Sequence, residues 1–589
     1  MRIFYRSLQT AFLITVATFT NLPLHAQLTE REREEAREHA KESRLNKLSG
    51  PQRLHPITKE VINLPAPILV NFTERANWDL AHPKTDTTKR LVEDEAGENG
   101  YKFKPQTIRP DAKVCPIPKG TSTRGAGNDM KAANSPAPII SFNGVMGDGS
   151  EIPPDITAAA GINYVMETTN QAYGIYNKTT GALVSNVDIT TFYSASNGNG
   201  YFDPHILYDA VHGKWLAVID GNTSGGHGGL FLAVSKTTDP TGNWWIYTID
   251  DGVSSSTLLD FPEMGYNENW VVLTANLFSS NVTTEIYVLN RASLYNGTQG
   301  TITHFTDANS FCLSPAQTMD TTTTTEWLVQ NANGNSGGSG YVQVGSITGT
   351  VAAPAYNAGS QLGVAQPWNE NAVQAPQQGG GSNLIDNDDT RIYSSEFING
   401  SLWFAHTVWL PASGTATYSG VDWWQVNPAT LTVQQFGRVA SSPSWYYYPC
   451  IYANAAGDAL LGYSASSSSL YAGAVYAFHA SADAINTMET LYTYKAGVSS
   501  FAPSGFGGDF RWGDYTSVAV DPNDNSFWVA GEWANTGNLW ATQIAHVGAS
   551  APVTNPPVAN FSANVTTSTE WNDAEWWISG LHLLSRNAK

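Results

Sequence analysis

Short runs in which apolar and polar residues alternate recur along most of this chain, and turn residues separate them. Residues 516–520 form one such run, residues 521–525 indicate a tight turn, and residues 527–529 begin a second run. Alternation with a period of two predicts a β-strand with one buried face. The pattern therefore predicts hairpins, and a glycine-rich loop at residues 505–513 precedes this one.

The hairpin unit repeats from residue 137 onward at intervals of roughly 40–60 residues, the range of β-propeller blades. Six units contain three or four short strands each, and the seventh is one strand short. Residues 137–142 could supply the missing strand and remove an open edge. A β-sandwich with loops is the alternative, but seven repeats are too many for one sandwich. The sequence thus predicts an all-β fold, a seven-bladed β-propeller closed by an N-terminal strand, with an irregular N-terminal extension. The predicted innermost strands are residues 155–159, 205–208, 262–266, 312–318, 391–397, 450–453 and 515–520.

The two ends of the chain predict export and appended segments. Arg2 and Arg6, an apolar run at residues 11–19 and a cleavage site at residues 24–26 are typical of a signal peptide. No later run approaches about 20 apolar residues, so we expect no transmembrane segment and a secreted or cell-surface monomer. The predicted divisions are residues 1–26 (signal peptide), 27–136 (a charged helix at 30–41 and an extended arm), 137–549 (β-propeller) and 550–589 (linker and truncated tail).

Composition supports a sheet protein and excludes one functional class. Charged residues make up only 14% of the chain, aromatic residues 11%, and there are 52 glycines, a balance typical of strands with many turns. The formal net charge is -20, and no basic stripe is present, so we exclude a nucleic-acid partner. Cys115, Cys312 and Cys450 could form one disulfide with one thiol left over, and the pairing stays open.

Loop lengths predict which face of the propeller carries the binding residues. In a four-stranded blade, the loops between strands two and three and the connections between blades lie on one face. These segments are long and rich in glycine and serine, and long loops on a rigid scaffold carry most binding residues. We therefore place the functional face there. The segments are residues 221–229, 331–340, 411–420 and 464–473 between strands, and 353–389 and 496–510 between blades.

The starts of the innermost strands supply the candidate ligand-binding residues. Five aspartates at equivalent positions would give the opening of the propeller's central funnel on this face a negative charge. A negative charge there favours a cation, a polyhydroxylated ligand or a basic group. The alternative is that each aspartate accepts turn N–H groups. The candidates are Asp155, Asp203, His205, Asp260, Glu263, Asp389, Arg391, Arg511, Trp512 and Asp514.

The residues at the opening of this funnel also fit two other functions, Ca²⁺ binding and a sialidase-like reaction. Residues 386–389, Asp-Asn-Asp-Asp, could hold Ca²⁺ through oxygen ligands but lack the spacing of an EF-hand, so an acidic turn is the alternative. Arg391 and Arg511, with Tyr515 or Tyr393, could serve a sialidase-like reaction, although the repeat Ser-x-Asp-x-Gly-x-Thr-Trp is absent. The aromatic residues expected to stack on sugar rings are Trp512, Trp533, Tyr201 and Trp445.

Several motifs carry a resemblance to known proteins. At 153–155 (Pro-Pro-Asp), 202–204 (Phe-Asp-Pro), 260–262 (Asp-Phe-Pro) and 511–515 (Arg-Trp-Gly-Asp-Tyr) the chain resembles secreted bacterial β-propeller proteins loosely grouped with sialidase-like propellers. Residues 557–564 resemble the opening strand of a PKD-type module, found in surface and polysaccharide-acting proteins. Too few residues follow for a full module of about 100, so we expect a truncated one.

These observations lead to one preferred hypothesis and two alternatives. We expect a secreted propeller that binds a glycan or protein ligand through an acidic, loop-rich funnel face. A sialidase-like glycoside hydrolase is the alternative, and a structural cell-surface protein is the second. No cofactor is certain, and Ca²⁺ is the one candidate.

Overall fold

The computed structural model describes residues 56–84, 90–91, 105–119, 134–254, 258–278, 282–503 and 509–550. The chain divides into two compact units, Met1–Ala549 and Ser550–Lys589, and the fold below is that of the first. The predicted signal peptide, the charged helix at residues 30–41 and the truncated PKD-type tail lie outside the described residues. No helix among the described residues is long and apolar enough to cross a membrane.

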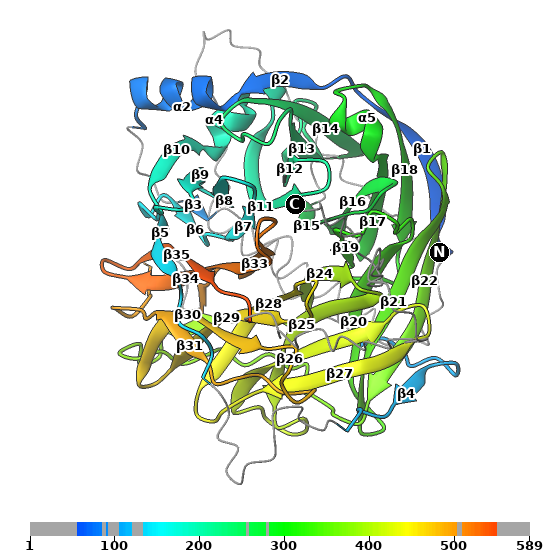
Figure 1. The fold of residues 1–589 in the computed structure, drawn as a ribbon, viewed down its shortest axis with the longest axis vertical. Helices are drawn as coiled ribbons and strands as arrows, with labels where there is room; N and C mark the ends of the chain where they lie inside the picture. Colours follow the sequence, from blue (N-terminus) through cyan, green and yellow to red (C-terminus); the bar gives the residue numbers. More distant parts are fainter. Residues whose placement is uncertain are drawn as a thin grey trace, which may run out of the picture. The chain divides into compact units, whose positions relative to one another are not determined.

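The unit is all-β, and its described strands form groups of four that pair antiparallel in chain order (Figure 1). The first three groups are β7 (Thr157–Ala160), β8 (Tyr164–Thr168), β9 (Ala172–Asn177) and β10 (Leu183–Asp188); β11 (Asn199–Asp209), β12 (Lys214–Asn222), β13 (His227–Ser235) and β14 (Asn243–Ser254); and β15 (Leu258–Tyr266), β16 (Trp270–Phe278), β17 (Val282–Asn290) and β18 (Gly300–Asp307). Short helices α4 (Ile189–Tyr193) and α5 (Arg291–Tyr295) follow β10 and β17.

Three further groups continue the same order along the chain. They are β19 (Ser314–Gln317), β20 (Glu326–Ser336), β21 (Ser339–Thr350) and β22 (Ala353–Val364); β24 (Ile392–Ile398), β25 (Ser401–Leu410), β26 (Tyr418–Asn427) and β27 (Thr432–Val439); and β28 (Trp445–Ala453), β29 (Ala459–Ser467), β30 (Leu470–His479) and β31 (Tyr492–Lys495).

The last group combines strands from both ends of the unit. It consists of β33 (Ser517–Val520), β34 (Phe527–Asn535), β35 (Leu539–Val547) and β5 (Ile140–Met146). Strand β5 pairs antiparallel with β35, with Phe142 opposite Ile544 and Ser141 opposite Ala545. This is the pairing that the strand count of the sequence led us to expect.

The first strands of successive groups lie next to one another. Strand β7 contacts β11 and β33, and β11, β15, β19, β24, β28 and β33 contact each other in that order. A parallel pairing of one or two residues joins β19 to β15 and to β24, which links three groups into a single 14-stranded sheet. In Figure 1 the groups follow one another around the unit in chain order.

Some segments that we expected to be loops are strands. Residues 353–364 form β22, the fourth strand of its group, and residues 331–336 and 339–340 extend β20 and β21. Strands β12, β13, β29 and β30 also run into the predicted loops. Glycine and serine do not prevent pairing at a strand end, because the partner strand satisfies their backbone groups. The loops between strands two and three are therefore shorter than expected.

The N-terminal segment covers outer edges of these groups. Strand β1 (Thr58–Leu64) pairs with β18, β2 (Ile68–Asn71) with β14, and β4 (Lys113–Cys115) with β22. Each of the three outer strands thereby gains a partner for backbone groups that an edge would leave open. Strand β2 ends at Asn71, whose side chain caps helix α2 (Phe72–Ala81) by accepting from the Glu74 N–H.

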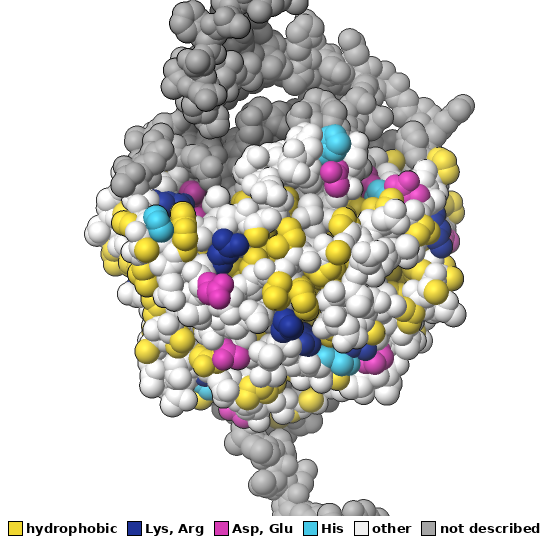
Figure 2. Space-filling view, turned by 90° about the horizontal axis from the view of Figure 1, so that it is seen from above, with side chains coloured by type: hydrophobic (Ala, Val, Ile, Leu, Met, Phe, Trp, Pro, Cys, Tyr) yellow, Lys and Arg dark blue, Asp and Glu magenta, His cyan; other side chains and the backbone are white. Residues whose placement is uncertain are grey.

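Packing between the groups is dominated by aromatic residues. The largest fully buried side chains are mostly tryptophans, among them Trp215, Trp244, Trp270, Trp424 and Trp540. Such rings fill space between neighbouring sheets and bury large apolar areas. Figure 2 shows one side of the unit, where charged side chains are scattered among neutral polar and apolar ones. All three cysteines are buried and free, so the disulfide that we left open is not formed.

Candidate functional site

Four of the innermost strands carry an irregularity near their start, where the predicted site residues lie. The register shifts in β11, β15, β24 and β28. In three of these strands the residue before a proline adopts a positive φ: Asp203 (52°), Phe261 (58°) and Tyr448 (52°). Bulky residues avoid this region, and each instance costs about 1–3 kcal/mol, so the surrounding contacts must hold it in place.

The register corrects one expectation. The sequence suggested that the predicted aspartates occupy equivalent positions, but Asp203 corresponds to Phe261 and Tyr448, whereas Asp260 is displaced by one residue and corresponds to Phe202. The sequence already contains this difference, because Asp203 directly precedes a proline, whereas Phe261 separates Asp260 from the next one.

Rings from five groups meet beside these strand starts. Tyr515 lies 5.4 Å from Phe261, 6.1 Å from Tyr393 and 4.4 Å from His205 between ring centroids, and Tyr393 lies 5.5 Å from Tyr448. We call these five residues the aromatic cluster. All are buried, so the rings fill the space where the strands converge. Burial raises the pKa of Tyr515 well above its usual value, and Asp203 adds to this, so the phenol stays neutral and can donate to Asp203 Oδ2, 3.2 Å away.

A network of carboxylates and amides joins the first group to the last. Asp155 Oδ1 accepts from the Asp514 N–H at 2.8 Å, and Arg511 Nη2 donates to Asp514 Oδ2 at 2.9 Å. Asn170 connects two of the predicted residues, because its Nδ2 donates to Asp155 and its Oδ1 accepts from the Asp203 N–H. Burial, followed by the charge of Asp514, raises the pKa of Asp155 to about 7. Near neutral pH this carboxyl therefore exists in both its acid and its ionised form.

Arg391 accounts for the acidic run that we considered for Ca²⁺. Its guanidinium donates to Asp389 Oδ1 and Oδ2 at 3.1 Å each, and it lies 2.8 Å from Asp388 Oδ2. It also lies over the rings of Phe261 (4.7 Å) and Phe311 (5.3 Å). One guanidinium thus pairs with both carboxylates and offsets one of their two charges. Among the described residues, the clusters of possible metal ligands do not include residues 386–389, so the structure gives the Ca²⁺ site there no support.

Another group of carboxylates could hold a cation. Oxygens of Asp203, Asp220 and Asp260 lie within 4.8 Å of one another, and all three residues are buried. Carboxylate oxygens are the ligands that Ca²⁺ and Mg²⁺ prefer. Asp220 was absent from the sequence prediction because it lies at the end of a second strand, β12, opposite Phe202.

Glu263 and His205 occupy corresponding positions of β15 and β11, and both side chains are neutral acid–base groups. Burial raises the pKa of Glu263 well above its usual value, although Arg391 lowers it, and burial lowers the pKa of His205 to about 3. Among the described residues neither Glu263 Oε1 nor His205 Nε2 has a hydrogen-bond partner. The site therefore combines a carboxyl group that can donate a proton with nitrogen and carboxylate oxygen atoms that can accept one, an arrangement suited to binding hydroxyl groups or to proton transfer.

Two connections from distant parts of the chain cover this region. Strand β23 (Leu384–Asp386) pairs parallel with β32 (Asp509–Arg511), and we call this pair the ribbon. The Gln377 side chain fastens the two connections together, because its Nε2 donates to the Phe501 carbonyl at 2.6 Å and its Oε1 accepts from the Phe501 N–H at 2.7 Å. Ile385 and Phe510 of the ribbon share one hydrophobic core with Phe261, Tyr393, Tyr448 and Tyr515 of the aromatic cluster.

Burial corrects the expectation of an open acidic funnel. The predicted site residues are at most 9% exposed, because the ribbon and the aromatic cluster pack against them. The rings proposed to stack on sugars are buried as well and bind protein groups: Trp512 donates to Ser464 Oγ, Trp533 donates to the Thr542 carbonyl, and Tyr201 pairs with Ser196, while Trp445 lies in the core. None of these four rings presents a free face.

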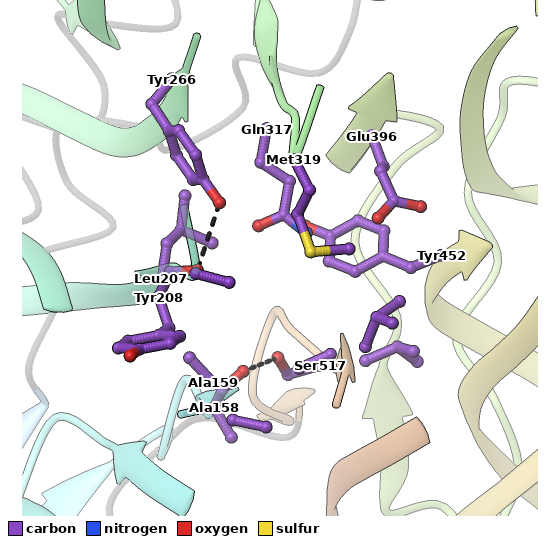
Figure 3. A pocket seen from close by; sticks show the side chains of 15 residues that line it. Ala158, Ala159, Leu207, Tyr208, Tyr266, Gln317, Met319, Glu396, Tyr452 and Ser517 are labelled. Atoms are coloured by element: carbon purple, nitrogen blue, oxygen red, sulfur yellow. Dashed lines mark hydrogen bonds between the residues drawn. The ribbon is translucent and has the colours of Figure 1, made fainter. Parts of the chain in front are cut away.

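A small cavity lies at the other ends of the innermost strands (Figure 3). Its volume of about 30 Å³ corresponds to roughly one water molecule. Figure 3 shows Glu396, Gln317 and Tyr452 around it, with Tyr266 donating to the Tyr208 carbonyl. Burial raises the pKa of Glu396 to about 8, while its Oε2 accepts from the Ala453 N–H at 2.7 Å.

Comparison with known proteins adds only distant structural similarities. No protein-family model matches the chain, and no curated protein matches it in sequence. Similar solved structures include a thermostable family-43 glycoside hydrolase (13% identity, 50% of this chain and 91% of that chain, TM-score 0.25). A second is a mutant Trypanosoma rangeli sialidase with trans-sialidase activity (10% identity, 70% of this chain and 60% of that chain, TM-score 0.31). A third is the N-terminal domain of Nup159 (7% identity, 74% of this chain and 100% of that chain, TM-score 0.34). At these TM-scores, the fold of the chain rests on its own strand pairings.

Proposed function

We propose that the first unit is a seven-bladed β-propeller whose ring is closed by β5. Seven antiparallel groups of four strands, arranged with their first strands in contact one after another, support this proposal. The contact between β7 and β33 and the pairing of β5 with β35 join the first group to the last. We also propose that the protein is exported, on the basis of the signal-peptide pattern at residues 1–26.

We propose that this propeller binds a glycan beneath the ribbon, at the buried residues Asp155, Asp203, Asp260, Glu263 and Tyr515. We call this the carboxylate site. The observation that carries the proposal is the convergence of Asp155, Glu263 and Tyr515, which can donate protons, with the acceptor Asp203. Sugar hydroxyls both donate and accept, so they match this mixture better than a single charged group does. Because these residues are at most 9% exposed, a glycan reaches them only when the ribbon moves aside, and a folded protein partner is too broad to follow.

Glycan binding is tested with the purified protein and two conservative variants. Tyr515→Phe removes only the hydroxyl that donates to Asp203, and Asp155→Asn replaces the titrating carboxyl group with an amide of similar size. On a glycan array followed by calorimetry, we expect each variant to lose at least about tenfold in affinity, the equivalent of 1.4 kcal/mol. Asp239→Asn, at an exposed turn, is the control and should bind as the wild type. Equal affinity for all four proteins, or no glycan bound, would reject the proposal.

A glycoside hydrolase is the second candidate, because the site offers a pair of neighbouring carboxyl groups. Asp203, Asp220 and Asp260 each bring an oxygen within 4.8 Å of the others, and most glycosidases use two carboxyl groups as acid and base or nucleophile. Arg391 and Arg511 are each paired with their own aspartates, which weighs against a sialidase-type arginine cluster for a substrate carboxylate. Hydrolysis of a glycan by the wild type, lost in Asp260→Asn, would establish this activity in place of binding alone.

A further inference from the structure

A groove lies between the first and last groups, at the ends of the strands opposite to the carboxylate site. On one side it is lined by the turns at residues 162–164 and 177–179 of the first group. On the other side lie the turn at residues 521–524, His546 of β35 and the start of β5. The groove is open to solvent and has a volume of about 710 Å³, within the range of ligand pockets. We call it the seam groove.

Its two walls are tied together, so the groove exists before any ligand arrives. Lys178 of the first group lies 2.6 Å from Asp521 Oδ2 of the last group and also donates to the Gly161 carbonyl at 2.7 Å. Asn523 Nδ2 donates across the groove to the Ile162 carbonyl at 2.8 Å. A preformed site loses less conformational freedom on binding than a mobile one.

The one cationic side chain of the seam groove is already paired within the protein. Lys178 is the one cationic residue among those that line it, and Asp521 holds its ammonium group. Asp521 also accepts from Trp528 Nε1 at 2.8 Å. Burial lowers the pKa of His546 below its usual value, so its imidazole is neutral at pH 7. Asp524 is thus the one charge left without an ionic partner among these residues, and an anionic ligand would find no free cation.

A metal ion is also a poor occupant, although ligand atoms are close together. Oxygens of Asp521 and Asp524 and a ring nitrogen of His546 lie within 4.8 Å of one another. A cation there would have to displace Lys178 from Asp521, and His546 Nε2 already bonds to Ser526 Oγ at 2.6 Å. The internal ammonium therefore takes the place that a metal would need.

What remains on the groove surface is neutral and mixed in character. Asn163, Thr179 and Asn523 supply amide and hydroxyl groups, while Ile139 (67% exposed) and Ile162 (40% exposed) supply apolar surface beside the ring of Tyr164. Sugar rings have apolar C–H faces that pack on such surface and hydroxyls that need both donors and acceptors. We propose that the seam groove is a second binding site, independent of the carboxylate site, and that it takes a neutral oligosaccharide.

The proposal is tested by titrating the whole protein with cellohexaose, xylohexaose, laminarihexaose and chitohexaose. We expect at least one to bind, with a loss of tenfold or more in Asn163→Ala and in Tyr164→Ala. Asn399→Ala is the matched control, because Asn399 occupies the corresponding turn of another group, and its affinity should stay unchanged. Thermal unfolding of each variant shows that the fold is kept.

The two sites are distinguished by one further variant. Tyr515→Phe, in the carboxylate site, should leave binding at the seam groove unchanged. If none of the four oligosaccharides binds, or if Asn163→Ala and Tyr164→Ala bind as the wild type does, the seam groove is not an oligosaccharide site. Binding that Tyr515→Phe abolishes and the groove variants retain would also overturn the proposal, and would place the ligand in the carboxylate site.

Discussion

At the scale of single residues, buried carboxyl groups are the unusual feature of this protein. Burial raises the pKa of Asp155 and Glu167 to about 7 and that of Glu396 to about 8. A carboxyl that keeps its proton near neutral pH can donate a hydrogen bond, which an ionised one cannot do. Residues of this kind concentrate at functional sites, and Asp155 and Glu263 occur together in the proposed glycan site.

The raised pKa of Asp155 predicts a stability that depends on pH. Between about pH 4 and pH 7 the unfolded chain releases this proton while the folded protein retains it, so the free energy of unfolding falls as pH rises. One proton contributes a slope of up to about 1.4 kcal/mol per pH unit. The contribution that favours folding is therefore complete below about pH 4 and is lost by about pH 7.

Asp155→Asn tests this dependence, because asparagine cannot titrate while its amide oxygen can still accept from the Asp514 N–H. In urea unfolding between pH 4.5 and 7.5, we expect the variant to show a shallower decline of stability with pH than the wild type. Asp239→Asn, at an exposed turn, should keep the wild-type slope. Identical slopes for Asp155→Asn and the wild type would contradict the prediction.

At the scale of elements, the ribbon controls access to the carboxylate site. Strands β23 and β32 belong to connections about 125 residues apart, and Gln377 fastens them through two hydrogen bonds to Phe501. A buried hydrogen bond contributes about 1 kcal/mol, and leaving a buried partner unsatisfied costs about 1–3 kcal/mol. Loss of Gln377 should therefore loosen the ribbon before it affects the four-stranded groups.

Gln377→Ala is expected to increase amide hydrogen exchange at residues 384–386 and 509–511 by at least about fivefold, which corresponds to roughly 1 kcal/mol of local opening. Exchange in β25 and β29 should stay at the wild-type rate. The matched control is Gln343→Ala, since Gln343 is also buried and donates to a backbone carbonyl, that of Ala358, within one group. A ribbon that exchanges equally slowly in Gln377→Ala would show that Gln377 does not fasten it.

At the scale of the whole unit, one pairing joins the two ends of the sequence. Strand β5 precedes the first group, yet it forms the outer strand of the last one beside β35. This arrangement gives β35 a partner and links segments about 400 residues apart. The proposed closed propeller depends on this contact, because without it the last group would lack its fourth strand and β35 would be left as an open edge.

A disulfide engineered across this pairing would test it. Asn143 and Gln543 are direct partners in the register, so Asn143→Cys with Gln543→Cys should cross-link on oxidation. We expect the oxidised protein to be about 2–4 kcal/mol more stable than the reduced one, and the cross-linked peptide to be found by mass spectrometry. The native cysteines are buried, and each single-cysteine variant should stay uncross-linked. Free thiols at both positions after oxidation would contradict the pairing.

The sequence predicted much of the strand order, for a physical reason. Short apolar and aromatic runs such as residues 205–208 and 527–529 lie next to turn residues, so the local pattern nearly determines their conformation. Residues 353–364 were missed because alanine, glycine and asparagine give no such run. That segment becomes β22 because it pairs along its length with β21.

The candidate site, like the fold, was predicted from the sequence only in part. The positions of Asp155, Asp203 and Asp514 near the strand starts followed from the repeat, and the structure joins these residues through Asn170 and the Asp514 N–H. The contribution of Asp220, the sharing of Arg391 by two aspartates, and the ribbon were not predicted. They depend on contacts between residues that lie far apart in the sequence or on different strands.

The sequence by itself determined that this chain forms repeated antiparallel groups and that acidic residues begin its innermost strands, because period and turn chemistry are local properties. Only the tertiary structure decided that those residues are covered and that burial raises the pKa of one of them, Asp155, to about 7. It also decided that a groove without a free cation opens at the opposite strand ends. Burial and electrostatic environment arise from all the elements that pack around a side chain, and no single stretch of sequence contains them.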